Sequence, residues 1–139
     1  VGFVQAQRWI ANNNVGRASF LLERLNSGEF NSRQRRTVSD EALTRLERAE
    51  NWLPDMPEID NLKGTAYMML GRYREASESY GLAARGVPSP EVLTNLAASY
   101  IAQGKLVEAE AQLELALRYD HRFQKAIDAR NHIFSMEQK

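Results

Sequence analysis

The sequence contains no cysteine, only two histidines and four prolines, and no long hydrophobic run. Without cysteine the chain can form no disulfide, no thiolate zinc site and no cysteine nucleophile. Its apolar runs are far shorter than the ~20 residues that a membrane-spanning helix needs. The 18 basic and 18 acidic residues cancel, which removes the strongly basic charge typical of nucleic-acid-binding proteins. These absences argue against a disulfide scaffold, a membrane span and a nucleic-acid-binding domain.

The chain has 139 residues, 43% of them hydrophobic, which is enough for one domain with a continuous core. Its charge is unevenly distributed. Residues 1–39 hold six Arg and two Glu, a net charge of +4, whereas residues 40–80 hold five basic and nine acidic side chains, a net charge of −4. Because the chain begins at Val1, we expect a processed or excised piece of a longer protein. Its compartment stays unknown: a soluble segment of either the cytoplasm or the periplasm fits.

Two similar ten-residue segments lie 33 residues apart, YMMLGRYREA from Tyr67 and YIAQGKLVEA from Tyr100. The flanking residues extend this likeness over residues 57–89 and 90–122, each of which begins with Pro-Glu. Apolar residues three and four apart predict amphipathic helices. Proline suits the first position of a helix, and Gly71 and Gly104 supply the positive φ that ends one. Each unit is therefore predicted to be two antiparallel helices joined by a tight turn.

Small residues stand at the predicted contact between the two helices of each unit. Gly64 and Ala97 lie one turn before the tyrosines, and Ala76 and Ala109 lie in the second helices. Helix axes 8–10 Å apart require small side chains at the contact with larger ones beside them. We therefore expect these positions to be buried between the helices.

These units resemble tetratricopeptide repeats, which are helical hairpins with a period of ~34 residues. Two departures are Lys63, where the family usually has leucine, and His121, where it usually has proline. The resemblance implies an all-α, right-handed solenoid with one repeat at 57–89 and another at 90–122. The matching residues are Gly64, Tyr67, Gly71, Tyr73, Ala76, Tyr80, Ala83 and Pro88 in the first, and Leu96, Ala97, Tyr100, Gly104, Ala109, Leu113, Ala116 and Asp120 in the second.

Residues 1–56 fit the repeat less closely, and we expect degenerate N-terminal helices of the same kind there. Residues 1–30 are predicted to form a hairpin with Asn12–Asn14 in its turn. Ser39-Asp40-Glu41 predicts the start of a further helix that ends at Pro54, after a first helix reduced to a turn or two beyond Asn31. The expected packing stripes are Ala6, Trp9, Ala18, Leu22 and Leu25, then Ala42, Leu46, Ala49 and Leu53.

Residues 123–139 are predicted to form a C-terminal capping helix that shields the last hairpin. Its expected face carries Ala126, Ile127, Arg130 and Phe134.

Residues suited to catalysis are few. His121 falls in a predicted turn, and Asp128 precedes His132 by four residues, a spacing that favours a solvated pair over an acid–base dyad. Neither histidine has further ligands at metal-binding spacing, and Gly104-Lys105 lacks the rest of a phosphate-binding loop. We therefore predict no enzymatic activity, no cofactor and no metal.

The sequence RQRR places Arg33, Arg35 and Arg36 together without an interleaved aromatic residue, so nucleic-acid binding is disfavoured. Two interpretations stay open. The cluster is a solvated turn, or it meets an acidic stretch in the same or a neighbouring chain. That stretch consists of Glu47, Glu50, Asp55, Glu58 and Asp60.

Stacked helical hairpins form an extended concave face that binds partners. The resemblance implies that first helices line this face. We expect a non-catalytic protein-interaction module or adaptor that holds an apolar peptide or helix there, although Met68 and Ile101 could instead pack against neighbouring hairpins. The residues carried over are Asn61, Thr65, Met68, Met69, Thr94, Ala98, Ile101 and Ala102, joined by Gln7, Ile10 and Ala11 from the N-terminal helices.

Other functions fit the sequence less well. Some members of the family hold an acidic C-terminus with Lys, Asn and Arg, but here only Asn95 matches that set. Polysaccharide binding would need aromatic residues in the groove, and the groove residues include none. The alternative is a structural or oligomerisation module of a larger membrane or cell-envelope assembly, such as a secretion, pilus or exopolysaccharide system. In that case the ends of the solenoid would make the contacts.

Overall fold

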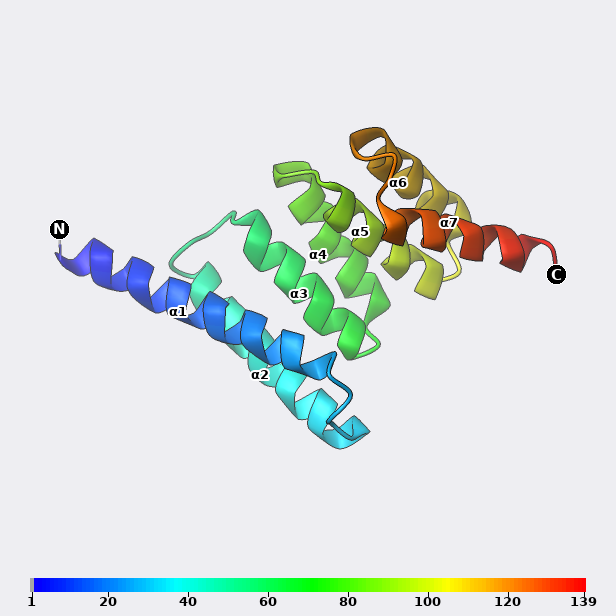
Figure 1. Cartoon of the computed structure of the whole chain (residues 1–139). Helices are drawn as coiled ribbons and strands as arrows, with labels where there is room; N and C mark the ends of the chain where they lie inside the picture. Colours follow the sequence, from blue (N-terminus) through cyan, green and yellow to red (C-terminus); the bar gives the residue numbers. More distant parts are fainter. Residues whose placement is uncertain (1) are drawn as a thin grey trace.

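A computed structural model describes residues 2–139 and folds them into seven helices without a strand (Figure 1). Successive helices pack against one another, and the two ends of the chain lie at opposite ends of the molecule (Figure 1). The predicted all-α solenoid is confirmed. The helices are α1 (Gly2–Leu25), α2 (Ser32–Glu50), α3 (Pro57–Met69), α4 (Tyr73–Gly86), α5 (Pro90–Ala102), α6 (Leu106–Tyr119) and α7 (Gln124–Glu137).

The turns inside the α3–α4 and α5–α6 hairpins have the predicted geometry. Gly71 and Gly104 have φ values of 72° and 74°. In the first turn the amide of Arg72 donates to the carbonyl of Tyr67 at 2.9 Å, and the amide of Gly71 donates to that of Met68 at 3.1 Å. This pair of bonds is the Schellman motif, which satisfies carbonyl groups at the end of a helix. The α5–α6 turn repeats the same bonds, so the glycine prediction is confirmed for both hairpins.

The small residues lie between the helices, as expected. Ala76, Ala97 and Ala109 are fully buried. A Cβ atom on Gly64 would lie 2.6 Å from the ring of Tyr80, a distance that no real Cβ contact tolerates. Only glycine therefore lets α3 approach α4 this closely. The half-buried ring of Tyr67 packs beside this contact.

The predicted turn at Asn12–Asn14 is wrong, because α1 is one continuous helix of 24 residues. The side chain of Asn14 donates to the carbonyl of Ile10 at 3.0 Å, a bond that fits inside a helix. The turn comes later, at Gly28, where φ is 78°. Trp9, expected on the packing stripe, is 69% exposed, and Ala6 is exposed too. The buried residues of α1 recur with a helical period across the asparagines and are Ala11, Asn14, Val15, Ala18, Leu21, Leu22 and Leu25.

The predicted start of the next helix at Ser39 is also wrong. α2 begins at Ser32, and Asn31 is its N-cap. Asn31 Oδ1 accepts from the amide of Gln34 at 2.9 Å, and Gln34 Oε1 accepts from the amide of Asn31 at 3.0 Å, which is a capping box. Ser39 is buried inside the helix, where its hydroxyl donates to the carbonyl of Arg35 at 2.8 Å. No shortened first helix exists between them, and α1 and α2 form one long hairpin.

Three groups of buried residues form a core along the chain, one for the α1–α3 region and two further along. α7 packs against both α5 and α6. Its buried residues are Ala126 and Ile133, whereas Phe134, which the sequence placed on the packing face, is 63% exposed. Ala126 is therefore buried as expected, but the packing face continues through Ala129 and Ile133 rather than through Arg130 and Phe134.

Candidate functional site

The first helix of each hairpin, together with α7, forms one face of the molecule. α1 contacts α3, α3 contacts α5, and α5 contacts α7, whereas α2, α4 and α6 lie behind them (Figure 1). Asn95 Nδ2 on α5 donates to Asn61 Oδ1 on α3 at 3.4 Å. Lys125 on α7 pairs with Glu91 on α5 at 3.3 Å. These polar contacts join neighbouring helices of this face. We call the surface shared by α1, α3, α5 and α7 the inner face.

On α3, the structure brings Asn61, Thr65 and Met68 to half-buried positions. The hydroxyl of Thr65 lies 3.0 Å from the hydroxyl of Tyr80 on α4. Burial raises the pKa of Tyr80 to about 12, although its hydrogen bond with Thr65 acts in the opposite direction. Met68 packs against the core group that includes Tyr80 and Leu96, so part of its side chain serves packing between hairpins.

Met69 is separated from these residues. It packs against the core of the α1–α3 region, and its sulfur accepts a contact from Arg35 Nη2 at 3.6 Å. The structure therefore places Met69 at the junction of α2 with α3, away from Met68, which adjoins α4 and α5.

On α5 the candidate residues differ in accessibility. Thr94 is buried, and its hydroxyl donates to the carbonyl of Pro90 at 2.7 Å, so little of it is available to a partner. Ala98 and Ile101 are half-buried, and Ile101 packs against the C-terminal core. Ala102 is exposed. From α1, Gln7 is half-buried, Ile10 is 42% exposed and Ala11 is fully buried.

The three arginines of RQRR have two different roles. Arg35 is half-buried, and its Nη1 donates to the carbonyl of Leu25 at 2.9 Å, which ties the start of α2 to the end of α1. Arg33 and Arg36 instead line a pocket of about 640 Å³, together with Arg72. Sequence reasoning missed this pocket because Arg72 lies in the distant α3–α4 turn. We call it the basic pocket, lined by Ser32, Arg33, Arg36, Asp40, Met69, Leu70 and Arg72.

The basic pocket and the acidic stretch occupy opposite ends of α2. Arg36 and Glu47 are separated by 11 residues, which is roughly 16 Å along a helix axis. No ion pair joins the arginines of RQRR to this stretch within residues 2–139. Contact between the two within one chain, one of the open interpretations, is therefore wrong.

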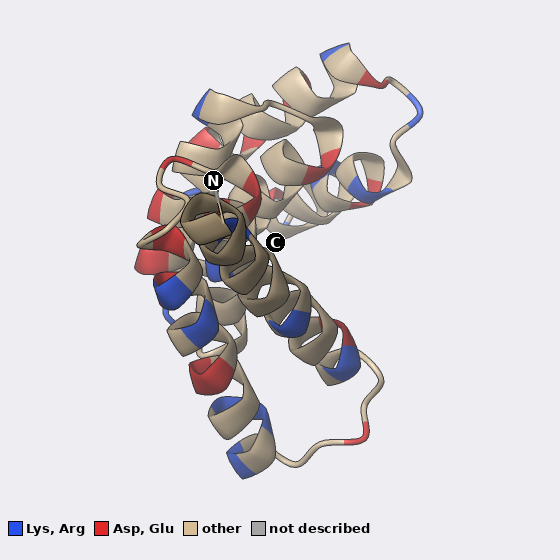
Figure 2. Ribbon diagram, turned by 90° about the vertical axis from the view of Figure 1, so that its left-hand side faces the viewer, with Lys and Arg blue, Asp and Glu red and all other residues tan. Residues whose placement is uncertain are grey.

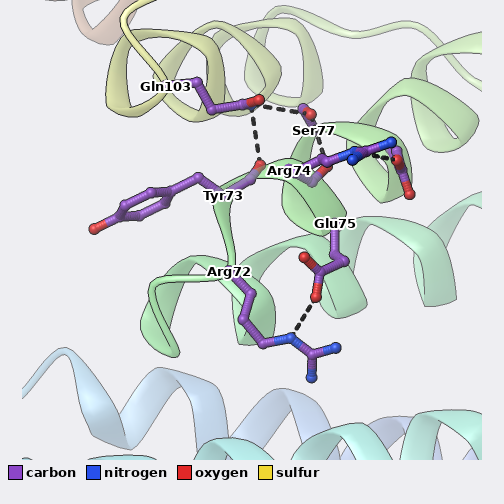
Figure 3. A network of polar contacts seen from close by, with 7 residues as sticks. Arg72, Tyr73, Arg74, Glu75, Ser77 and Gln103 are labelled. Atoms are coloured by element: carbon purple, nitrogen blue, oxygen red, sulfur yellow. Dashed lines mark hydrogen bonds and ion pairs between the residues drawn. The ribbon is translucent and has the colours of Figure 1, made fainter.

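A network of polar contacts joins the α3–α4 turn to the end of α5 (Figure 3). Gln103 Nε2 donates to the carbonyl of Tyr73 and to the hydroxyl of Ser77, each at 3.1 Å. Arg72 pairs with Glu75, and its guanidinium lies 4.8 Å from the centre of the Tyr67 ring. These contacts hold α4 and α5 in register and fix Arg72 beside the basic pocket.

The residues considered for catalysis do not come together. His121 and His132 are exposed, and Asp128 accepts from Gln124 Nε2 at 2.7 Å rather than from a histidine. Among residues 2–139, no group of three or more metal-ligating side chains is suitably placed to hold a metal ion. Over the same residues, no helix has the length and apolar character needed to cross a membrane.

Two charged groups have shifted pKa values near the acidic stretch. Burial and the neighbouring Glu50 raise the pKa of Asp60, while Lys63 acts against the shift. Burial lowers the pKa of Lys63, but the hydrogen bond with Glu50, at 3.0 Å, and the charges of Glu50, Tyr67 and Asp60 together outweigh it, so the net shift is upward. Carboxylates are therefore crowded where α2 meets α3.

Comparison of the sequence with protein-family models gives no match, and comparison with curated proteins gives none either. Solved structures do resemble the chain. One is TTC0263, a thermophilic TPR protein of Thermus thermophilus, with a TM-score of 0.74 and 24% identity over 93% of this chain. The chain spans 64% of that protein.

A second similar structure is the first TPR of Spaghetti (RPAP3) bound to the HSP90 peptide SRMEEVD, with a TM-score of 0.69 and 21% identity over 89% of this chain and 95% of that one. A third is a variant of MamA, with a TM-score of 0.63 and 18% identity over 96% of this chain and 88% of that one. At these identities the likeness concerns the fold.

Proposed function

We propose that this chain, which has the tetratricopeptide-repeat fold, is a non-catalytic protein-interaction module that holds an apolar peptide or helix of a partner against its inner face. The observation that carries the proposal is the continuous inner face of α1, α3, α5 and α7. On this face, equivalent positions of α3 and α5 carry partly accessible apolar side chains, Met68 and Ile101. Stacked helices hold such residues in place before binding, which lowers the ordering cost.

The chemistry of this face favours an apolar segment over an acidic tail. Asn95, the one residue that matches the acidic-tail set of some family members, donates to Asn61. Thr65 and Thr94 stand where basic residues would be needed, and Thr94 is buried. The Spaghetti unit is bound to a peptide that contains two consecutive glutamates. Because the inner face of this chain lacks basic residues at Thr65 and Thr94, we do not propose an acidic peptide as its ligand. Methionine, by contrast, adapts its shape to irregular apolar partners.

The test uses the folded chain as bait in lysate of the source cell. Met68→Glu with Ile101→Glu places two charges on the inner face, and we expect the partner to be lost. Leu82→Glu with Leu115→Glu is the matched control, because both leucines are partly exposed on the outer helices α4 and α6. We expect this control to retain the partner.

Met68 and Ile101 are half-buried, so their substitution could unfold the chain. A second inner-face variant, Ala102→Arg, avoids this difficulty because Ala102 is exposed. Circular dichroism establishes that each bait is folded. Equal partner capture by the wild type and by a folded inner-face variant would refute the proposal.

A further inference from the structure

Opposite charges gather at the two ends of α2. Figure 2 shows basic positions where this helix begins and acidic positions at its other end, towards α3. The end of α2, the loop after it and the start of α3 carry five carboxylates against two cations, Arg48 and Lys63. We call this surface the acidic end, made of Glu47, Glu50, Asp55, Glu58 and Asp60. We propose that the basic pocket of one copy of this chain receives the acidic end of a second copy.

The basic pocket is lined by three arginines and one carboxylate, that of Asp40. Among the residues that the structure describes, Arg33 and Arg36 form no ion pair. Arg72 is already paired with Glu75, so its charge is largely compensated within the chain. A guanidinium group matches the geometry of a carboxylate with two parallel hydrogen bonds. The pocket therefore offers two arginines to incoming carboxylates.

The capping box already uses some of the backbone amides at the start of α2. Asn31 and Gln34 form the capping box there, so the first-turn amides are satisfied in part within the chain. The arginine side chains supply the charge instead. Met69 and Leu70 add an apolar part to the lining, which suits an apolar side chain that arrives between carboxylates.

The acidic end has the complementary chemistry. Lys63 pairs with Glu50, but Glu47, Asp55 and Glu58 have no ion-pair partner within residues 2–139. The raised pKa of Asp60, caused by burial and then by Glu50, agrees with this crowding. In the loop beside these carboxylates, Trp52 is 45% exposed. The carboxylates match the arginines of the basic pocket, and the exposed ring of Trp52 matches its apolar lining.

Each copy carries both halves of the contact on different surfaces. Its own pocket and its own acidic end are too far apart to meet, so the contact has to be made between copies. One copy can donate its acidic end and receive that of another, either in a two-fold pair or in a chain of copies. This association uses the start of α2 and the α3–α4 turn, and it is distinct from the apolar segment proposed for the inner face.

The test reverses the charge of each half separately. Arg33→Glu with Arg36→Glu makes the pocket acidic, and Glu47→Lys with Glu58→Lys makes the acidic end basic. All four residues are exposed, so the fold is expected to survive, which circular dichroism checks. Arg118→Glu with Arg122→Glu is the matched control, since it changes the same charge at exposed positions around the end of α6.

Sedimentation equilibrium measures the mass of each protein over a tenfold range of concentration. We expect the wild type and the control to associate at about 50 mM salt and to dissociate at about 0.5 M, because screening weakens exposed charge pairs. Each reversed variant alone is expected to associate roughly tenfold or more weakly. An equimolar mixture of the two reversed variants is expected to associate again, because each supplies the half that the other lacks.

Three results would overturn the proposal. The wild type could remain monomeric at every concentration in low salt. The control could lose association as fully as the pocket variant, which would show a general charge effect. The two reversed variants could fail to associate when mixed. None of these outcomes depends on the inner-face partner, so failure here is separate from failure of the proposed function.

Discussion

The ring of Tyr80 lies directly against the backbone of Gly64, so close that a Cβ atom on Gly64 would be 2.6 Å from it. This contact fixes the distance between α3 and α4. It also places the Tyr80 hydroxyl 3.0 Å from that of Thr65, at the edge of the inner face. Packing inside one hairpin thereby determines the surface that the hairpin presents.

Gly64→Ala is expected to destabilise the protein. The methyl group would force the Tyr80 ring or the whole of α4 to move, and overpacking of this kind costs about 1–3 kcal/mol of unfolding free energy. Urea denaturation followed by circular dichroism measures the change. Gly16→Ala is the matched control, since Gly16 lies inside α1 and a methyl group added there would have no heavy atom of another part of the chain within 4 Å. There we expect a gain of about 0.5–1 kcal/mol from helix propensity. Equal effects at the two glycines would contradict the role of packing at Gly64.

Because Tyr80 is buried, we expect the protein to lose stability at alkaline pH. Burial raises its pKa to about 12 in the folded state, against about 10 for an unfolded chain. Between these values the unfolded state releases the proton more readily, so unfolding becomes easier as the pH rises. Below about pH 10 the stability linked to the protonated Tyr80 hydroxyl is fully present. As the pH rises from about 10 to about 12, about 2–3 kcal/mol of unfolding free energy is lost.

Tyr80→Phe removes this titration and leaves the ring in place. The difference in unfolding free energy between wild type and variant, measured from pH 8 to pH 12, isolates Tyr80 from the other tyrosines and the lysines. At pH 8 we expect the variant to be about 1 kcal/mol less stable, because the bond to Thr65 is lost. The difference should shrink and then reverse above about pH 10. A difference that stays constant across this range would show that the Tyr80 hydroxyl is not buried.

The start of α2 gives a further prediction. Asn31→Ala removes the capping box and is expected to cost about 1 kcal/mol. Ser39→Ala, at the start that the sequence favoured, is expected to change stability by less than about 0.5 kcal/mol. The hydroxyl of Ser39 only adds a bond to a carbonyl inside the helix. Thermal unfolding of both variants distinguishes the two helix starts, and a larger effect at Ser39 would support the shorter helix.

The sequence predicts the hairpins of residues 57–119 well because their determinants are local. Gly71 and Gly104 end helices because glycine adopts positive φ. Gly64 and Ala76 are small, which indicates that each lies at a close contact with the neighbouring helix. The N-terminal helices were predicted poorly for the opposite reason. Three consecutive asparagines favour a turn, but the buried stripe on either side of them holds α1 together.

The basic pocket could not have been found from the sequence. Arg33 and Arg36 lie more than 30 residues from Arg72, and they meet only because α2 extends two turns further than expected. The Ser39-Asp40-Glu41 signal for a helix start hid that extension, since the same residue types also occur inside helices. The true N-cap at Asn31, with Gln34 three residues later, was a readable capping box in the sequence.

The different roles of Arg35 and Arg36 can be tested by comparing the stability of the two alanine variants. Arg35→Ala removes the bond from Arg35 to the carbonyl at the end of α1 and its contact with Met69. We expect a loss of about 1–2 kcal/mol of unfolding free energy, since the lost bond involves a charged donor and the site is half-buried. Arg36→Ala removes the same charge one residue later, from an exposed side chain with no ion pair among the described residues. Its stability should change by less than about 0.5 kcal/mol. Denaturation of the two variants under the same buffer makes the comparison. Equal losses would mean that the cluster acts through its summed charge rather than through the hydrogen bond that joins α2 to α1.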